Sequence, residues 1–248
     1  MLKIVFKFLT LVILAVYLVF AIVHWAHPQE DELCSGVDYL VRHRGEVPER
    51  SIVDVRFVAN QMKRAHLSPV GKQLKDVNLR GLKAMLEKNV YIDSAFCYYT
   101  AAGTLCVGVV PKVPVMQVIT PTKKYFLTDR GNTMPMGKYE LGLPQVTGDV
   151  SVARARKLLP LLQHIRHSHW KDQVEEVRLD PGQGLLFVMR DEPFEVVMGS
   201  EEDYEEKLQN LELFLEKALP KVERDKYAFI NVAFEGQVVA VKKKKKTS

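Results

Sequence analysis

An uncharged apolar stretch near the amino terminus constrains this chain more than any other feature. The residues from Phe8 to Ala26 include no Asp, Glu, Lys or Arg. As a helix rising about 1.5 Å per residue they would extend over roughly 28 Å, close to the roughly 30 Å hydrocarbon core of a bilayer. The stretch therefore predicts a transmembrane helix over residues 8–26.

A cleaved signal peptide is the alternative interpretation of this stretch. The stretch exceeds the roughly 7–15 apolar residues of a secretion signal, and the bulky pair His24 and Trp25 does not suit a cleavage site. Lys3 and Lys7 precede the stretch, whereas acidic residues follow it. The positive-inside rule therefore predicts that the short amino-terminal tail is cytoplasmic and that the rest of the chain is exported.

Composition indicates a folded protein without a distributed basic surface. The chain has 248 residues, of which 47% are hydrophobic, enough for one large domain or two smaller ones. The lysine run 242–246 alone accounts for the formal net charge of +5, so the remainder is close to neutral. Nucleic acid is therefore not an expected partner.

Three cysteines, with no CxxC spacing, do not form a metal or redox motif. Cys97 and Cys106 flank an expected hairpin, which leaves open a bridge between them. In the other interpretation, Cys97 and Cys106 are simply two small apolar residues of the strands. Their spacing is more typical of this second interpretation.

The first half of the exported part predicts a β-α-α-β-β order. A strand is expected in 33–44, a helix from about 50 to 65, a second helix after the capping residue Asn78, and two hairpin strands over 91–99 and 104–111. Such an order gives a small sheet with two helices on one face. The residues expected on the inner faces of the two helices are Ile52, Val55, Val58, Ala59 and Met62, then Leu79, Leu82, Met85 and Leu86.

From Pro114 the pattern becomes strand-rich. Short strands are expected over 114–120, 124–136 and 143–150, followed by a helix that Ser151 caps and that Pro160 kinks or divides. An antiparallel meander over 174–200 comes next. Ser200 and Asp203 then predict a capping box for a helix over 201–219 with Tyr204, Leu208, Leu211 and Leu215 facing the core.

No residue pattern predicts catalysis or a cofactor. His164, His167 and His169 are the best metal-ligand candidates, but basic side chains are also typical of a helix carboxyl end. No hydrolase or phosphate-binding motif is present in the sequence. We expect a protein that is not an enzyme, and a membrane-tethered hydrolase that uses the His164 region is the competing class.

Several local segments resemble the bacterial cell division family FtsQ/DivIB. They are "PVMQVI", "YFLTDRGNTMP", "VTGDV", "HWKDQVEEVRLD" and the closing "YAFINVAFEGQVVAVKKKKK". The resemblance implies an α+β chain with a POTRA-like domain and a mixed α/β FtsQ-type β domain that has an antiparallel sheet. It divides the chain into a cytoplasmic tail (1–7), the transmembrane helix (8–26), the POTRA-like domain (27–113), the β domain (114–241) and a basic tail (242–248).

The same resemblance implies a function without catalysis. Family members are scaffolds of the inner membrane that recruit the FtsB and FtsL proteins to the division septum, with their folded domains in the periplasm. The alternative is a POTRA-bearing envelope component for polypeptide handling or outer-membrane assembly. POTRA-like modules also bind by strand addition, so the resemblance makes the strand "DYLVRH" a second candidate edge.

The end of the chain predicts a hairpin that finishes on an exposed edge. Ile230, Val232 and Phe234 alternate toward a core, Glu235-Gly236 turns the chain, and "QVVAV" returns as the last strand. A free edge binds a foreign strand by β-augmentation, and the lysines would limit indiscriminate pairing. The alternative is that the valines only complete a core. The resemblance places partner binding at Phe234, Gln237, Val238, Val239, Ala240 and Val241.

Overall fold

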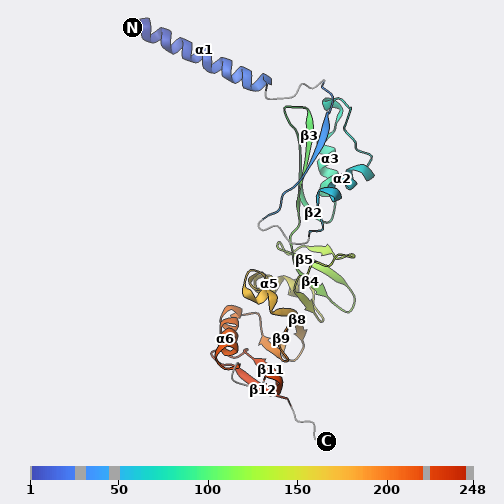
Figure 1. The fold of residues 1–248 in the computed structure, drawn as a ribbon, viewed down its shortest axis with the longest axis vertical. Helices are drawn as coiled ribbons and strands as arrows, with labels where there is room; N and C mark the ends of the chain where they lie inside the picture. The colour runs from blue at the N-terminus through green and yellow to red at the C-terminus, as the bar shows by residue number, and fades with distance from the viewer. Residues whose placement is uncertain (1, 26–31, 45–50, 220–223, 244–248) are drawn as a thin grey trace. The chain divides into compact units, whose positions relative to one another are not determined.

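The computed structural model describes residues 2–25, 32–44, 51–219 and 224–243. The chain forms two compact units, Met1–Lys112 and Val113–Ser248 (Figure 1). Each unit has a hydrophobic cluster of its own around one sheet.

The first element is the long helix α1, Leu2–Trp25. Its large apolar side chains between Phe6 and Ile22 are exposed. In α1 the described side chains are those of residues 6–22. Among the described residues, no helix is both long and apolar enough to span a membrane. The transmembrane helix expected over 8–26 is therefore not confirmed and stays a prediction.

The first sheet has three strands in the order β1-β3-β2. β1 is Gly36–Val41, β2 is Ile92–Tyr99 and β3 is Thr104–Pro111. β1 pairs parallel with β3, and β2 pairs antiparallel with it. The helices α2, Val55–Arg64, and α3, Leu79–Glu87, pack on one face, with the short η1, Leu74–Asp76, between them in sequence. The predicted β-α-α-β-β order is confirmed.

Capping explains where the two helices begin. The side chain of Asn78 accepts a hydrogen bond from the Gly81 amide at 2.8 Å, as the sequence predicted. Asp54 caps α2 in the same way, through the Phe57 amide at 2.6 Å. Because α2 starts at Val55, the expectation that Val55 faces the core is wrong: its side chain is 47% exposed, in the first turn of the helix.

The register of β2 and β3 separates the two neighbouring cysteines. Cys97 lies opposite Val107, whereas Cys106 lies opposite Tyr98. Adjacent residues of a strand point to opposite faces, so the two thiols lie on opposite sides of the sheet and cannot form a bridge. Both are free thiols. Burial, with a smaller contribution from Cys106, raises the pKa of the Cys97 thiol to about 11.

The second sheet has nine strands in the order β12-β11-β10-β9-β8-β7-β4-β5-β6. The strands are β4 Pro114–Ile119, β5 Lys124–Thr128, β6 Thr133–Pro135, β7 Gln145–Thr147, β8 Val174–Asp180, β9 Gly184–Met189, β10 Glu195–Gly199, β11 Tyr227–Asn231 and β12 Val239–Lys242.

The expected antiparallel sheet is in fact mixed. The hairpins and the β8-β9-β10 meander are antiparallel, but the pairs β4-β7, β7-β8 and β10-β11 are parallel. Helical connections separate β7 from β8 and β10 from β11, and a crossover of that kind returns the chain to the same end of the sheet.

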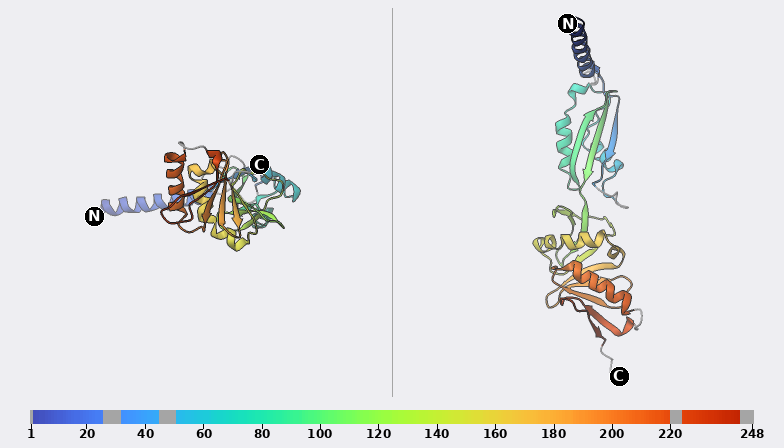
Figure 2. Two further views of the ribbon diagram at one scale, coloured as in Figure 1. Left: turned by 90° about the horizontal axis from the view of Figure 1, so that it is seen from below. Right: turned by 90° about the vertical axis from the view of Figure 1, so that its left-hand side faces the viewer.

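Helices cover one face of this sheet (Figure 2). They are α4, Val152–Lys157, α5, Leu159–Arg166, and α6, Tyr204–Lys217; the short η2, His169–Asp172, and η4, Arg224–Lys226, complete the unit. Ser151 caps α4 as predicted, by accepting from the Arg154 amide at 3.1 Å. Pro160 lies in the first turn of α5, so the expected helix is divided and not merely kinked.

The predicted capping box before α6 is wrong. Asp203 is the residue before the helix, but it has a left-handed φ of 50° and its side chain caps no amide. The Ser200 hydroxyl lies 3.3 Å from the Lys207 ammonium nitrogen instead. The core face of α6 is confirmed, since Leu208 and Leu211 are buried and Tyr204 and Leu215 pack against the same cluster.

We expect a methyl group at Gly184 to destabilise the second unit strongly. Gly184 has a φ of +78°, and a Cβ there would lie 2.3 Å from the Gly199 carbonyl oxygen. The substitution G184A should lower the free energy of unfolding by about 1–3 kcal/mol through this steric overlap. The left-handed backbone, which alanine disfavours, should cost about 1–2 kcal/mol more. Urea unfolding followed through the fluorescence of the buried Trp170 measures the loss.

The matched control is G142A. Gly142 has a similar φ of +64° but open space around its Cβ position. Only the backbone cost applies there, so equal losses at the two glycines would contradict the close approach of β9 and β10.

Candidate functional site

Among the described residues, the second sheet ends in two strands, β12 and β6, and each has one neighbouring strand. A strand of this kind leaves half of its peptide N–H and C=O groups without a partner in the sheet. Figure 1 shows β11 and β12 together at one end of the unit, with β12 outermost. These two edges are the places where a foreign strand is able to extend the sheet.

The β6 edge is protected against such pairing. The strand has three residues and ends in Pro135, which has no N–H to donate. Its central residue, Met134, is buried. Short length and proline are common devices against edge-to-edge association.

Local hydrogen bonds build the hairpin that places β12 at the other edge. The Asn231 side chain accepts from the Ala233 amide at 2.9 Å, which turns the chain out of β11. The Gln237 amide then donates to the Phe234 carbonyl at 3.2 Å, with Gly236 at a φ of +62°. The turn predicted at Glu235-Gly236 is confirmed.

The two faces of β12 have different surroundings. Ala240, with Val238 just before the strand, packs against the main core, and Ala240 lies opposite the fully buried Ile230. Val239 and Val241 point to the other face, beside Asn231 and Phe229. Val239 is 40% exposed. The strand is therefore anchored on one face and accessible on the other.

The direction of the peptide groups follows from two backbone hydrogen bonds. The Val232 amide donates to Val197 of β10 at 2.9 Å, and the Lys243 amide donates to Lys226 at 2.7 Å. Peptide groups of successive strand residues point to alternate sides. In β12 the groups of Val239 and Val241 therefore face β11, and those of Ala240 and Lys242 face the open side.

The predicted partner-binding residues are distributed over this hairpin. Val239, Ala240 and Val241 lie in β12, Val238 precedes it, and Gln237 lies in the turn. Phe234 lies outside both strands and is 56% exposed, so its expected place in the core is wrong. The binding role of all six residues stays a prediction.

Lysine side chains lie at the carboxyl end of the edge. Lys242 belongs to β12, and it is exposed, as are Lys243 and Lys226. The bond from the Lys243 amide to Lys226 brings η4 beside the start of the lysine run. Arg224 of the same short helix pairs with Glu192. Residues 244–246 lie outside the described part of the chain.

Two features of this edge were not predicted from the sequence. The apolar pattern predicts that the last strand ends at Val241. The strand continues through Lys242, because Lys242 pairs with Tyr227 of β11. Phe229 was assigned to no face, and it lies beside Val241 on the accessible side. Strand alternation counted from the buried Ile230 identifies Phe229, once the pairing is known.

The three histidines proposed as metal ligands have separate neighbours. His164 packs edge-on against Tyr204, the His167 ring bonds the Gln163 carbonyl at 2.7 Å, and the His169 ring lies 3.2 Å from the Glu212 carboxylate. Among the described residues there is no group of three or more His, Cys, Asp or Glu side chains that would hold a metal ion.

Comparison with known proteins identifies both units. Residues 113–241 match the family described as FtsQ/DivIB, C-terminal related, and residues 34–110 match the POTRA-like domain. No curated protein matches the chain. The first match covers more than half of the chain.

We expect amide exchange to alternate along β12. The N–H groups of Ala240 and Lys242 face the open side, so they exchange with solvent at least about tenfold faster than those of Val239 and Val241, which are bonded to β11. Hydrogen exchange measured by NMR on the purified protein tests this. Equal protection of Ala240 and Val241 would show that the open side is occupied.

Proposed function

The chain belongs to the FtsQ/DivIB family of division-associated scaffolds, which are not enzymes, and from this membership we propose that it recruits FtsB- and FtsL-type partners to the septum. Recruitment takes place by strand addition to the free edge of β12. Phe234 and the segment 237–241 form the contact surface, and no cofactor, nucleic acid or small-molecule substrate takes part.

The observation that carries this proposal is the open side of β12. Ala240 and Lys242 direct peptide groups away from β11, and the strand has one neighbour in the described sheet. An added strand would satisfy these groups, and its side chains would alternate between the core side, near Ala240, and the accessible side, near Val239. Main-chain bonds supply affinity in this binding mode, and the flanking side chains supply selectivity.

The lysines support selectivity at the same edge. Lys242 and Lys243 are exposed where a partner strand would pass. Positive charge on an edge disfavours pairing with a second copy, because the two lysine runs would repel each other. The same charge attracts a partner segment that carries Asp or Glu.

Membrane anchoring is the second part of the proposal. The uncharged residues 8–26 form the anchor, with residues 1–7 in the cytoplasm, residues 27–113 and 114–241 as periplasmic domains and 242–248 as a basic tail. The exposed apolar side chains of α1 support this, since they have no protein cover and a bilayer provides one. The protein is then a single-pass inner-membrane component.

We expect the substitution A240P to abolish most partner capture without unfolding the protein. Proline removes an N–H that faces the open side, so the incoming strand loses a main-chain bond while the β11 ladder remains. Capture of an FtsB-type partner on affinity resin should fall at least about tenfold, equivalent to about 1.4 kcal/mol. Unchanged capture would contradict binding at this edge.

Two variants control for other effects at the hairpin. A240S keeps the N–H and should capture the partner as well as the unsubstituted chain does. V239P removes an N–H that faces β11, so it should lower the free energy of unfolding by more than A240P does. A loss of capture with A240S would assign the effect to the side chain and not to the peptide group.

We expect charge in the amino-terminal stretch to release the protein from membranes. Arginine at a membrane centre costs about 2.5–3.5 kcal/mol, so V12R combined with V16R opposes insertion by about 5–7 kcal/mol. The unsubstituted chain should resist alkaline extraction from membranes, and the double variant should be extracted. L213R, at an exposed position of α6, serves as the control. Extraction of the unsubstituted chain would contradict the anchor.

A further inference from the structure

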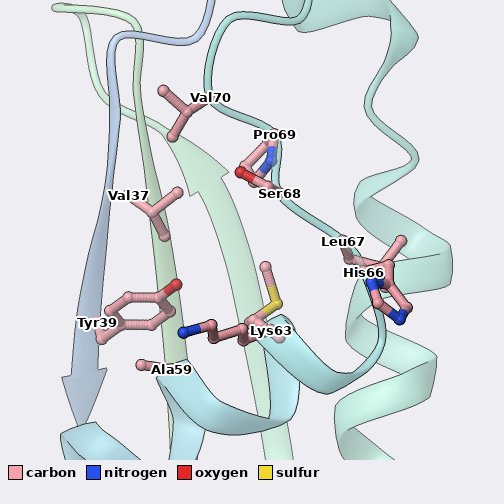
Figure 3. Close-up of a pocket in the computed structure, with 10 residues that line it drawn as sticks. Val37, Tyr39, Ala59, Lys63, His66, Leu67, Ser68, Pro69 and Val70 are labelled. Carbon is pink, nitrogen blue, oxygen red and sulfur yellow. The ribbon is translucent and has the colours of Figure 1, made fainter.

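The end of α2 and the segment that follows it combine positive charge with exposed apolar side chains (Figure 3). From Val55, where α2 begins, to Lys75 the sequence has five Lys or Arg residues and no Asp or Glu. These five exposed residues are Arg56, Lys63, Arg64, Lys72 and Lys75. Leu67 and Val70 lie between them in the sequence and are 40% and 53% exposed. Residues 63–72, which include both apolar side chains, form the basic turn.

Backbone hydrogen bonds hold Leu67 at the end of α2. The Leu67 amide donates to the Met62 carbonyl at 3.2 Å, and the His66 amide donates to the Lys63 carbonyl at 3.1 Å. His66 has a left-handed φ of 53°. This combination is a Schellman motif, which ends a helix and holds the next residue beside the last turn. The backbone of Leu67 is therefore fixed, although much of its side chain is exposed.

A second turn holds Val70. The Lys72 amide donates to the Pro69 carbonyl at 3.0 Å, and Gly71 has the φ of +80° that the third residue of a type II turn requires. Val70 is the second residue of this turn and lies at its tip. The Gly71 amide also donates to the Cys34 carbonyl at 3.0 Å, which ties the turn to the segment before β1. Ordered backbone therefore presents both apolar side chains to solvent.

The cations of the basic turn have no side-chain partner in the described part of the chain. The side chains of Lys63, Arg64 and Lys72 form no hydrogen bond and no salt bridge there. Unpaired cations beside exposed apolar side chains are complementary to a layer of anionic lipid head groups. In such a layer the cations meet phosphate groups, and the apolar side chains enter the boundary with the acyl chains.

The short connection to α1 favours a membrane over a soluble acidic partner. Residues 26–35 alone separate Trp25, the last residue of α1, from Gly36, the first of β1. Even a fully extended chain of that length spans only about 35 Å. With α1 in the bilayer, as proposed above, the first unit stays within this distance of the bilayer. The connection therefore gives the lipid surface a high effective concentration.

We propose that the basic turn binds the surface of the membrane. Lys63, Arg64 and Lys72 pair with the phosphate groups of anionic lipids, and Leu67 and Val70 enter the head-group layer. The contact gives the first unit a preferred orientation on the bilayer. This inference rests on the proposed membrane anchoring, and it is independent of recruitment through β12.

An environment-sensitive label at position 67 tests the proposal. The variant L67C provides an exposed thiol for a nitrobenzoxadiazole maleimide at neutral pH. The native thiols compete little, because Cys34 and Cys106 are buried and the pKa of Cys97 is raised to about 11. The labelled full-length chain is placed in lipid nanodiscs of phosphatidylcholine alone or of phosphatidylcholine and phosphatidylglycerol in equal parts. Emission should be at least about twofold higher in the charged discs, and added salt should reverse the increase.

Charge reversal tests the role of the cations. The L67C chain that also carries K63E, R64E and K72E should lose the increase in emission. The matched control reverses three exposed lysines of the second unit, K124E, K138E and K171E. It changes the net charge by the same amount and should keep the increase.

A label on the other face of the first sheet controls for position. Cys97 and Tyr99 pack on the helix side, so Tyr98 between them points to the opposite face, where it is 49% exposed. A label introduced through Y98C should have the same emission in both kinds of disc. A response there equal to the response at position 67 would overturn the assignment to the basic turn.

The outcomes separate this proposal from the anchor. Equal emission at position 67 in the two kinds of disc, from a chain that co-elutes with both, would overturn the basic turn as a lipid site and leave the anchor supported. A response to soluble polyglutamate without one to charged discs would also overturn it, because the surface would then suit an acidic protein. Failure to co-elute with neutral discs would contradict the anchor. Binding to charged discs that the triple variant abolishes would still support the basic turn.

Discussion

The alternation of peptide groups along β12 is the constraint on which the proposed recruitment depends. Val239 and Val241 bond β11, so the described sheet satisfies every second peptide group of β12. The groups of Ala240 and Lys242 have solvent on their side in the described sheet. A closed barrel would have no such edge, but this sheet is open and ends at the last hairpin. At the opposite end of the sheet, β6 is short and ends in Pro135, so it offers few peptide groups to a foreign strand.

The edge is accessible and also well supported. Ile230 of the neighbouring strand is fully buried beneath the helices, and Ala240 packs on the same core. A partner strand would therefore meet a template whose geometry is already set, so little ordering entropy on this side opposes binding. The lysines at the end of the strand add charge without entering the core. Rigidity and selectivity come from different residues of one hairpin.

Local sequence patterns predicted much of this fold where neighbouring residues decide the structure. Asn78 caps its helix, Pro160 ends one helix and begins another, and the strand over 104–111 has the predicted bounds. The misses occurred where distant segments decide. Ser200 accepts a hydrogen bond from Lys207 and does not cap α6. The second sheet is mixed because helical crossovers return the chain to the same end of the sheet. Phe234 continued an apolar alternation, but the turn at Asn231 ends the strand before reaching it.

The sequence by itself determined the family, the order of the elements, the uncharged amino-terminal stretch and the final hairpin with its lysines, because each depends on residue types that are close along the chain. Only the tertiary structure decided that β12 has a single neighbour among the described strands, and that Ala240 rather than Val239 offers its amide. These depend on register and on which segments pack side by side. Apolar periodicity identifies the buried face of a strand, but peptide-group direction is set by the neighbouring strand.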